Sequence, residues 1–263
     1  MAGTEQGAAR PRRSLLRRLI YWGAVLAVWG LIFLVVFFAV FARGLPDTSG
    51  LYQVDRQPSI TYLDRNGALI ATRGTQMAPP ADLEALPDYV PAAFIAIEDR
   101  RFYHHPGFDP IGMMRAAVTN MRAGRVVQGG STLTQQLAKN LFLTPDQTLH
   151  RKAQELMLAV WLEMKFTKAE ILALYLNRVY FGAGAYGIEA ASQRYFDKSA
   201  SDLTVGEAAL LAGLLKAPSR YSPLSESERA AARATVVLNE MEEAGVITAA
   251  QREQAVTQPV IVS

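Results

Sequence analysis

The chain has 263 residues, no cysteine and a formal net charge of +3. This length allows one substantial domain with appendages, and the absence of cysteine excludes disulfides and thiolate metal sites. Residues 1–18 hold five arginines against one glutamate, so the remainder of the chain carries a charge close to −1. The basic character is therefore local to the N-terminus and does not indicate a nucleic-acid-binding domain.

An uncharged, apolar run of 24 residues covers 19–42. It exceeds the roughly 20 residues that a helix needs to span a hydrocarbon core, and it is too long for the apolar part of an ordinary signal peptide. Five arginines precede the run and only Arg43 directly follows it. We therefore expect a single-pass transmembrane anchor, with the tail 1–18 cytoplasmic and everything downstream external.

The rest of the chain is predicted to be almost wholly helical. Residues 43–75 are expected to form a linker and a short β-hairpin, because Asn66-Gly67 is a turn signal between two β-prone runs. The main domain is expected at 76–250, and 251–263 as a C-terminal tail or a truncated linker. Gly, Pro, Asn or Asp stands at the breaks between the helical stretches. The expected helices cover 91–104, 110–123, 132–142, 149–165, 168–177, 187–195, 204–215, 226–243 and 248–255.

The first of these helices carries a carboxylate within an apolar pattern. Phe94, Glu98 and Phe102 recur every four residues, which places the Glu98 carboxylate on the apolar stripe. Burial raises the pKa of a carboxyl group and makes it a better proton acceptor near neutrality. The alternative is a structural ion pair with Arg100 or Arg101, and this helix alone does not separate the two.

A second stretch, GGSTLTQQLAKN, places a helix start after a glycine loop. Thr132 and Gln135 have the spacing of a capping box, which predicts that the helix begins there. The exposed amides of such a helix start attract anions. The alternative is an ordinary solvated helix face. The polar residues of this face are Gln135, Gln136, Lys139 and Asn140.

A third stretch combines two cations with a second glutamate. Arg151 and Lys152 lie four and three residues before Glu155, so the three side chains share one helix face. The residues that follow Glu155 are apolar nearly all round, which indicates a central helix. A carboxylate there is costly unless it is paired. The pattern predicts either a plain ion pair or an acidic group with cations that face a common cleft.

Three other patterns give weaker signals. The glycine-rich run FGAGAYG lacks the strand and the Lys-Ser/Thr of a phosphate loop, so a nucleotide site is not expected. His104-His105 has no third ligand at a plausible spacing, which disfavours a metal site. Met114, Val118 and Met121 form a stripe that is either core or a membrane-touching amphipathic face.

Taken together, five stretches resemble, in order, the five motifs of the peptidoglycan glycosyltransferases, glycosyltransferase family 51. They read EDRRFYHHPGFD, GGSTLTQQLAKN, RKAQELMLAVWLE, KAEILALYLN and VYFGAGAYGIEAAS, within a match over roughly residues 59 to 250. The resemblance implies a mainly α, lysozyme-like glycosyltransferase domain with a smaller, membrane-proximal lobe. It also implies polymerisation of lipid II at the outer face of the cytoplasmic membrane.

By motif, the resemblance implies a role for each candidate residue. Glu98 would be the general base that deprotonates the 4-hydroxyl of the acceptor N-acetylglucosamine, and Glu155 the second catalytic glutamate. The oxygen attacks C1 of N-acetylmuramic acid with inversion, and the polyprenyl diphosphate that leaves needs charge stabilisation. The diphosphate-facing cations would be Lys139, Arg151 and Lys152. The other implied substrate-binding residues are Asp99, Ser131, Thr132, Gln135, Gln136, Asn140 and Asn177.

The resemblance also predicts partners and location. Lipid II and the growing glycan strand would be the substrates of a bacterial inner-membrane protein that contacts membrane lipid. Other cell-wall synthesis proteins are candidate partners, and nucleic acid is not. No cofactor is implied as a requirement and no metal ligand is assigned, although Mg²⁺ or Mn²⁺ assists some members of the family.

The chain departs from the family pattern in two places. Gln147 stands where many relatives carry Arg or Lys, so one diphosphate contact is expected to be missing or replaced by His150. The hairpin and the tail 245–263 resemble the junction of a bifunctional class A penicillin-binding protein, yet no Ser-x-x-Lys or Lys-Thr-Gly motif of a transpeptidase follows residue 200. We expect either a monofunctional transglycosylase or, preferably, the N-terminal part of a bifunctional protein.

Two rival hypotheses stay open at this point. A lytic muramidase-like enzyme would use Glu98 as a general acid, and hydrolysis with inversion needs a second carboxyl group about 6.5–9.5 Å away. A non-catalytic membrane scaffold of the cell-wall machinery would need neither the glutamates nor the cations. The cation cluster favours a transferase that acts on a diphosphate.

Overall fold

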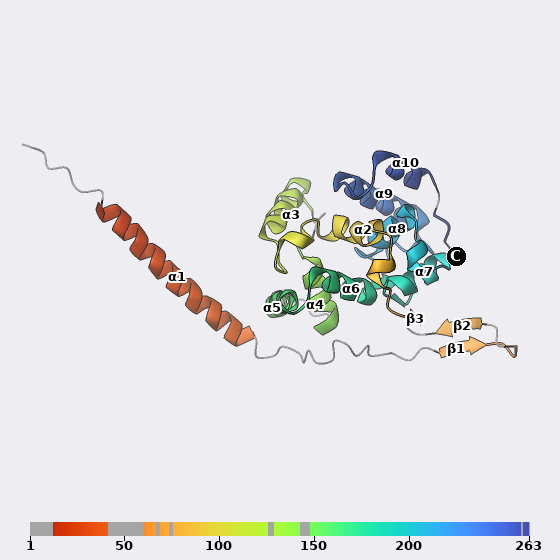
Figure 1. Ribbon diagram of the computed structural model, residues 1–263, viewed down its shortest axis with the longest axis horizontal. Helices are drawn as coiled ribbons and strands as arrows, with labels where there is room; N and C mark the ends of the chain where they lie inside the picture. Colours follow the sequence, from red (N-terminus) through yellow and green to blue (C-terminus); the bar gives the residue numbers. More distant parts are fainter. Residues whose placement is uncertain are drawn as a thin grey trace, which may run out of the picture. The chain divides into compact units, whose positions relative to one another are not determined.

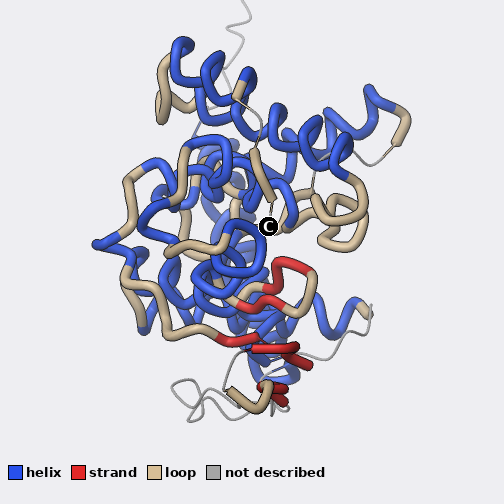
Figure 2. Tube along the Cα trace, turned by 90° about the vertical axis from the view of Figure 1, so that its right-hand side faces the viewer, coloured by secondary structure: helices blue, strands red, loops and turns tan. Residues whose placement is uncertain are grey.

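The computed structural model describes residues 13–41, 60–66, 69–73, 76–125, 129–142, 148–258 and 260–262. The chain divides into two units, residues 1–45 and 46–263. Helices form most of the second unit and its strands are short (Figures 1 and 2). The mainly α class predicted from the sequence is confirmed.

The helices of the second unit follow the predicted order. Each of the helix starts Thr167, Thr204 and Thr248 closes a capping box, which satisfies backbone N–H groups that the helix leaves free. The helices are α2 (Tyr89–Glu98), α3 (Pro110–Ala123), α4 (Leu133–Phe142), α5 (Leu149–Lys165), α6 (Lys168–Arg178), α7 (Ile188–Phe196), α8 (Val205–Leu214), α9 (Ser227–Glu243) and α10 (Ala249–Thr257). Single 3₁₀ turns cover Leu83–Ala85, Phe102–His104 and Ala200–Asp202.

Two small sheets complete this unit. Strands β1 (Ile60–Leu63) and β2 (Leu69–Arg73) pair antiparallel, as the turn signal between them predicts. Strand β5 (Ala185–Tyr186) pairs antiparallel with β4 (Tyr180–Gly182) and parallel with β3 (Gln76–Met77). The glycine-rich run, which lies between the expected helices 168–177 and 187–195, therefore forms a turn within a sheet.

The prediction of one helix over 91–104 is wrong, because α2 ends at Glu98. Asp99 leaves the helical region with φ −159° and ψ 72°, and its buried carboxylate accepts a hydrogen bond from the Leu133 N–H at 3.0 Å. Phe102 lies beyond the break, in a 3₁₀ turn. Glu98 is therefore the last residue of a helix, and not a position in the middle of one apolar stripe.

Helix α8 lies at the centre of the fold and packs against α2 and α9 (Figure 1). It is nearly uncharged and rich in alanine and glycine, and its residues from Ala208 to Leu214 are buried. A Cβ atom on Gly213 would lie 3.0 Å from Cγ of Arg233, so the glycine lets α9 approach closely. This packing brings Arg233, Val236 and Glu240 of α9 into the same cleft as the end of α2.

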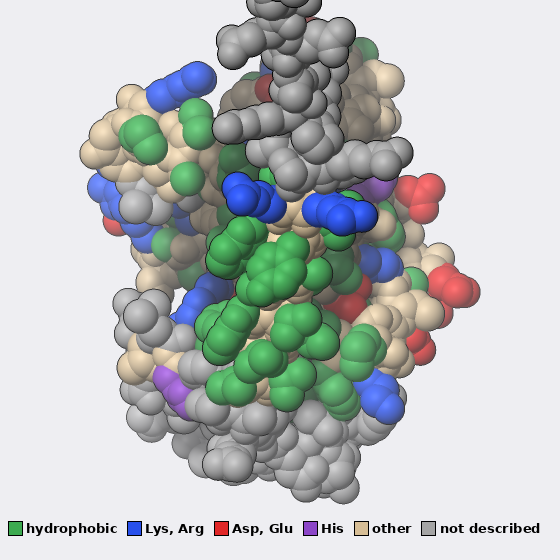
Figure 3. Space-filling view, turned by 90° about the vertical axis from the view of Figure 1, so that its left-hand side faces the viewer, with side chains coloured by type: hydrophobic (Ala, Val, Ile, Leu, Met, Phe, Trp, Pro, Cys, Tyr) green, Lys and Arg blue, Asp and Glu red, His purple; other side chains and the backbone are tan. Residues whose placement is uncertain are grey.

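The first unit contains helix α1 (Arg13–Phe41), which covers most of the predicted anchor. Hydrophobic side chains gather along its described part, next to basic side chains (Figure 3). Among the described residues, no helix is both long and apolar enough to cross a membrane. The anchor stays a prediction. The tail before residue 13 and the linker 42–59 lie outside the described residues.

Candidate active site

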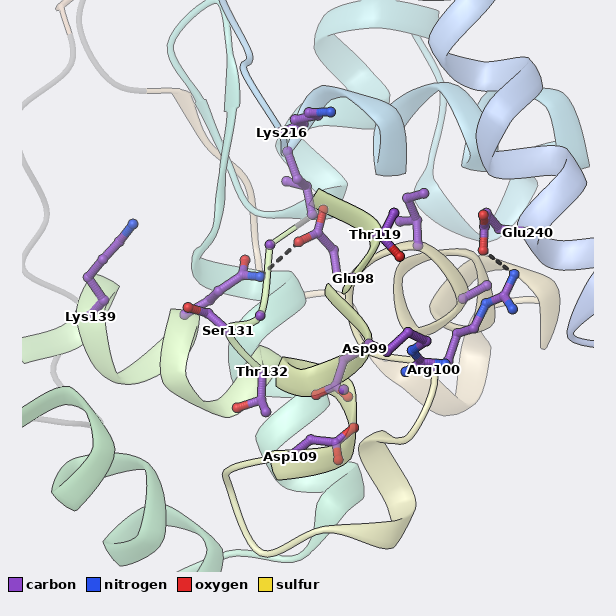
Figure 4. A pocket seen from close by; sticks show the side chains of 18 of the residues that line it. Glu98, Asp99, Arg100, Asp109, Thr119, Ser131, Thr132, Lys139, Lys216 and Glu240 are labelled. Carbon is purple, nitrogen blue, oxygen red and sulfur yellow. Dashed lines mark hydrogen bonds and ion pairs between the residues drawn. The ribbon is translucent and has the colours of Figure 1, made fainter. Parts of the chain in front are cut away.

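One cleft of about 590 Å³ brings together most of the residues predicted from the motifs (Figure 4). Its wall is built from the end of α2, one face of α3, the glycine loop before α4, the first turns of α5, and the α8–α9 region. The predicted site residues that line it are Glu98, Asp99, Ser131, Thr132, Gln136, Lys139, Arg151, Lys152 and Glu155.

Glu98 is half-buried at the cleft end of α2. Burial raises the pKa of its carboxyl group, and the charge of Asp99 acts in the same direction. A hydrogen bond from Gln136 Nε2, 2.8 Å from Oε2, and the charges of Arg233 and Lys216 act against this rise. The balance gives a carboxylate that accepts a proton more readily than an exposed one.

Glu155 lies in the interior, with 3% of its side chain exposed, and is paired by both neighbouring cations. Arg151 Nη1 is 3.5 Å from Oε2, and Lys152 Nζ forms an ion pair with Oε1. Lys152 Nζ also donates to Ser131 Oγ at 2.9 Å. The predicted ion pair is therefore present, and it lies on the cleft wall.

The cations of the cleft leave donors for a ligand. Lys139 is exposed in the last turn of α4 and forms no ion pair with any described residue (Figure 4). Arg151 Nε is buried and has no hydrogen-bond partner among the described residues. Both features suit an anionic group such as a diphosphate.

Asp99 also borders the cleft, but its carboxylate points away from that of Glu98 (Figure 4). It is buried, and its partners are the ring of His105 and the N–H of Leu133. This helps to explain the second histidine of the His104-His105 pair, because His105 is buried against Asp99 while His104 is exposed.

Three predicted site residues do not line the cleft. Gln135 is buried, and its Oε1 accepts from the Thr132 N–H at 3.3 Å, which completes the predicted capping box. The amide of Asn177 makes two hydrogen bonds with the backbone of Ala81, at 2.7 and 3.0 Å. Asn140 is exposed on α4. Gln147, at the departure from the family pattern, lies outside the described residues.

The cleft contains charged residues that the motifs did not indicate. Lys216 and Arg233 come from the α8–α9 region, and Figure 4 shows Lys216 beside Glu98. The single sequence signal for Lys216 is a lone cation at the end of a nearly uncharged helical run. Arg115 lies on α3 and also lines the cleft. In this segment the sequence pattern indicated the apolar stripe and gave no signal for Arg115.

That stripe on α3 is exposed, which excludes its interpretation as core. The exposed fractions are 70% for Met114, 45% for Val118 and 79% for Met121. Another face of the same helix, with Gly112 and Arg115, lines the cleft. An apolar surface therefore adjoins the cleft.

Most of the carboxylates that line the cleft are already engaged by basic side chains. Both oxygens of Glu155 are paired with cations, Asp99 is held by His105, and Glu240 pairs with Arg100. Hard cations such as Mg²⁺ need several free oxygen ligands at once. Among the described residues, no three acidic or histidine side chains form a group that could hold a metal ion.

Fold and cleft together define a helical domain in which a carboxylate with a raised pKa faces a group of cations. A family model described as Transglycosylase matches residues 66–242, which is more than half of the chain. The chain belongs to this family.

Curated relatives and a solved structure agree with this assignment. The chain is 47% identical over 240 residues to penicillin-binding protein 1A of Aquifex aeolicus, covering 91% of the chain and 33% of that protein. It is 46% identical over 216 residues to penicillin-binding protein 1A of Escherichia coli, covering 82% of the chain and 25% of that protein. The crystal structure of penicillin-binding protein 1A from Haemophilus influenzae matches with a TM-score of 0.50 and 26% identity, over 80% of this chain and 22% of that one. The chain thus spans a third or less of the length of these relatives.

Proposed function

We propose that the chain is a peptidoglycan glycosyltransferase that polymerises lipid II into glycan strands. The observation that carries the proposal is the position of Glu98, a carboxylate with a raised pKa, in one cleft with Lys139, Arg151 and Lys152. Membership of the transglycosylase family supports the same reaction.

In this proposal Glu98 is the general base. It removes the proton from the 4-hydroxyl of the acceptor N-acetylglucosamine, and the oxygen attacks C1 of the donor N-acetylmuramic acid from the face opposite the leaving group. The C1–O bond to the diphosphate breaks, and the configuration inverts from α to β. A base with a pKa nearer neutrality than that of a free carboxyl group suits this step.

The cations stabilise the leaving group. A polyprenyl diphosphate departs as an anion and needs positive charge more than a proton. We assign to it Lys139, Lys152 and the Nε of Arg151, which has no hydrogen-bond partner within the described part of the chain. Ser131 and Gln136 line the same cleft. We assign Glu155 the task of holding Arg151 and Lys152 in place, since both its oxygens are engaged by them.

The pairing of Glu155 also weighs against a muramidase. Hydrolysis with inversion requires a second carboxylate that is free to activate water. Glu155 is the candidate for this second carboxylate among the motif residues, and Arg151 and Lys152 already neutralise it. A scaffold without catalysis leaves the proximity of Glu98 to the cations unexplained.

One assay separates the three functions. The purified chain is incubated with lipid II, and the products are tested for polymer that a muramidase degrades. Polymer from the wild type and none from Glu98→Gln supports the proposal. Breakdown of preformed glycan instead would identify a muramidase, and no change in either substrate would indicate a scaffold.

We also propose that the chain works at the cytoplasmic membrane, with residues 19–42 as a single-pass anchor and the catalytic domain outside. The uncharged run, the arginines before it and the helical state of α1 support this topology. The exposed stripe Met114, Val118 and Met121 is proposed to touch the membrane surface beside the cleft, where a lipid-linked substrate would enter.

The same proposal includes the division of the chain into segments. These are a cytoplasmic tail, an anchor, a linker with hairpin, a lysozyme-like domain with a smaller membrane-proximal lobe at 76–250, and a C-terminal segment. The curated relatives of the chain are several times longer than the chain itself. We therefore favour the N-terminal part of a bifunctional class A protein, whose partners include other cell-wall synthesis proteins.

A further inference from the structure

Gln136 connects the carboxylate of Glu98 to a buried phenol. Its Nε2 donates to Glu98 Oε2 at 2.8 Å, and its Oε1 accepts from the hydroxyl of Tyr175 at 2.9 Å. Tyr175 is fully buried on α6, which packs against α4, the helix that carries Gln136. Both ends of the side-chain amide are therefore engaged inside the protein.

The hydroxyl of Tyr175 determines which end of the amide faces Glu98. A carboxamide offers a donor at its nitrogen and an acceptor at its oxygen, and a half-turn exchanges them. A neutral phenol donates to the oxygen, which leaves the nitrogen to donate to the carboxylate. Burial, with the charges of Glu98 and Asp99, holds the pKa of Tyr175 well above its ordinary value, so the phenol keeps its proton.

We propose that Tyr175 is a positioning residue, which acts through Gln136 to orient the carboxylate of Glu98 toward the acceptor hydroxyl. The catalytic meaning of this role rests on the proposed function of Glu98 as the base. The contact also sets the proton affinity of the base, because the hydrogen bond from Gln136 opposes the rise that burial causes in the pKa of Glu98. Without the phenol hydroxyl the amide loses its fixed orientation, and the pKa of Glu98 rises further.

The chain offers a matched control for the test. Tyr195 is also fully buried, and its hydroxyl donates to the carbonyl oxygen of Phe181 at 3.0 Å. Tyr195 lies on α7 and does not line the cleft. Tyr175→Phe and Tyr195→Phe therefore each remove one buried hydroxyl donor. Only the hydroxyl of Tyr175 belongs to the series of hydrogen bonds that leads through Gln136 to Glu98.

The experiment measures lipid II polymerisation against pH for the wild-type chain 1–263 and both variants. For Tyr175→Phe we expect kcat to fall about tenfold, the rate factor of one hydrogen bond, with little change in KM. The acidic limb of its profile should shift to higher pH, whereas Tyr195→Phe should keep the wild-type profile. An unshifted limb in Tyr175→Phe, or an equal shift in both variants, overturns the inference.

A second measurement does not depend on activity. With ¹³C-labelled glutamate, the pKa of Glu98 is read directly from its carboxyl resonance, assigned through Glu98→Gln. Tyr175→Phe should raise this pKa and Tyr195→Phe should not, and an unchanged value in Tyr175→Phe overturns the inference. A wild type that forms no polymer would overturn the proposed function alone, since the titration still decides whether Tyr175 acts on Glu98.

Discussion

Both carboxylate oxygens of Asp99 lie 2.9 Å from Nε2 of His105 in the protein interior. His105 Nδ1 accepts from the Gly107 N–H at 3.2 Å, so Nε2 carries the proton and donates to Asp99. Asp99 Oδ2 also accepts from the Leu133 N–H. One carboxylate thereby ties the end of α2 to the loop after it and to the first turn of α4, the helix that carries Gln136.

These contacts predict that Asp99→Ala lowers stability. The substitution leaves the His105 ring and the Leu133 N–H buried without their acceptor, which costs about 3 kcal/mol of unfolding free energy. Urea unfolding measures the loss. The exposed Asp202→Ala is the control, expected within about 0.5 kcal/mol of the wild type. If Asp99→Ala unfolds at the wild-type midpoint, Asp99 does not hold α2 to α4.

A second prediction concerns the stability of Glu98→Gln at different pH values. The pKa of Glu98 is raised in the folded state, chiefly by burial. Such a carboxyl group contributes stability below its unfolded pKa, and that contribution is lost as the pH rises through the folded pKa. Glu98→Gln should therefore be more stable than the wild type at about pH 8, and the gain should shrink toward about pH 4.

Urea titrations at both pH values check this prediction, with the exposed Glu228→Gln as the control. The control should show no comparable gain at the higher pH. If Glu98→Gln gains the same unfolding free energy over the wild type at both pH values, burial does not destabilise the ionised carboxylate of Glu98.

Lys139→Ala should impair catalysis without affecting the fold. Lys139 is exposed at the cleft and has no ion-pair partner among the described residues, so its charge is available to a diphosphate. We expect kcat/KM for lipid II to fall about ten- to a hundredfold, the range for one hydrogen bond to a charged group. Lys165→Ala, which removes another exposed lysine, should keep the wild-type value. Equal turnover in both variants would remove Lys139 from the donor site.

The sequence predicted those features of this fold that depend on residues close together in the chain. The capping box of Thr132 and Gln135 and the pair of Lys152 with Glu155 each join residues three positions apart. Helical periodicity and capping rules describe such spacings. The same local rules located most of the helices. That the motif residues form one site was implied by the resemblance to the glycosyltransferase family, and most of them do line one cleft.

Contacts between distant residues could not be predicted in this way. Helix α2 ends early because Asp99 binds the backbone of Leu133, 34 residues further on. Arg233 reaches the cleft because the small residues of α8 let α9 pack closely, which no local pattern encodes. Asn177 was assigned to the substrate from its motif, whereas its amide binds the backbone of Ala81, 96 residues away.

Gly107→Ala should destabilise the loop that follows α2. Gly107 has φ +89°, and a Cβ atom there would lie 2.9 Å from the carbonyl oxygen of Ala159 on α5. Both backbone strain and a clash therefore oppose a side chain, at a combined cost above about 2 kcal/mol. Gly124 has φ +63° but open space around it, so Gly124→Ala measures the strain alone, about 1 kcal/mol. Equal losses in thermal unfolding would show that the loop moves away from α5 freely.

The last prediction places the α3 stripe against lipid. The chain has no cysteine, so Met121→Cys creates a single attachment site for a polarity-sensitive fluorophore. Met121 is 79% exposed on the apolar face of α3, and burial of such a face in the acyl-chain boundary is favourable.

In the full chain reconstituted into vesicles, we expect a blue-shifted emission from the fluorophore at position 121 and quenching by lipids that carry a nitroxide on the acyl chain. Val256→Cys, an exposed apolar position on α10, is the control and should show neither effect. Emission from position 121 that matches an aqueous reference, with no quenching by the labelled lipid, would place α3 in water and remove the proposed membrane contact beside the cleft.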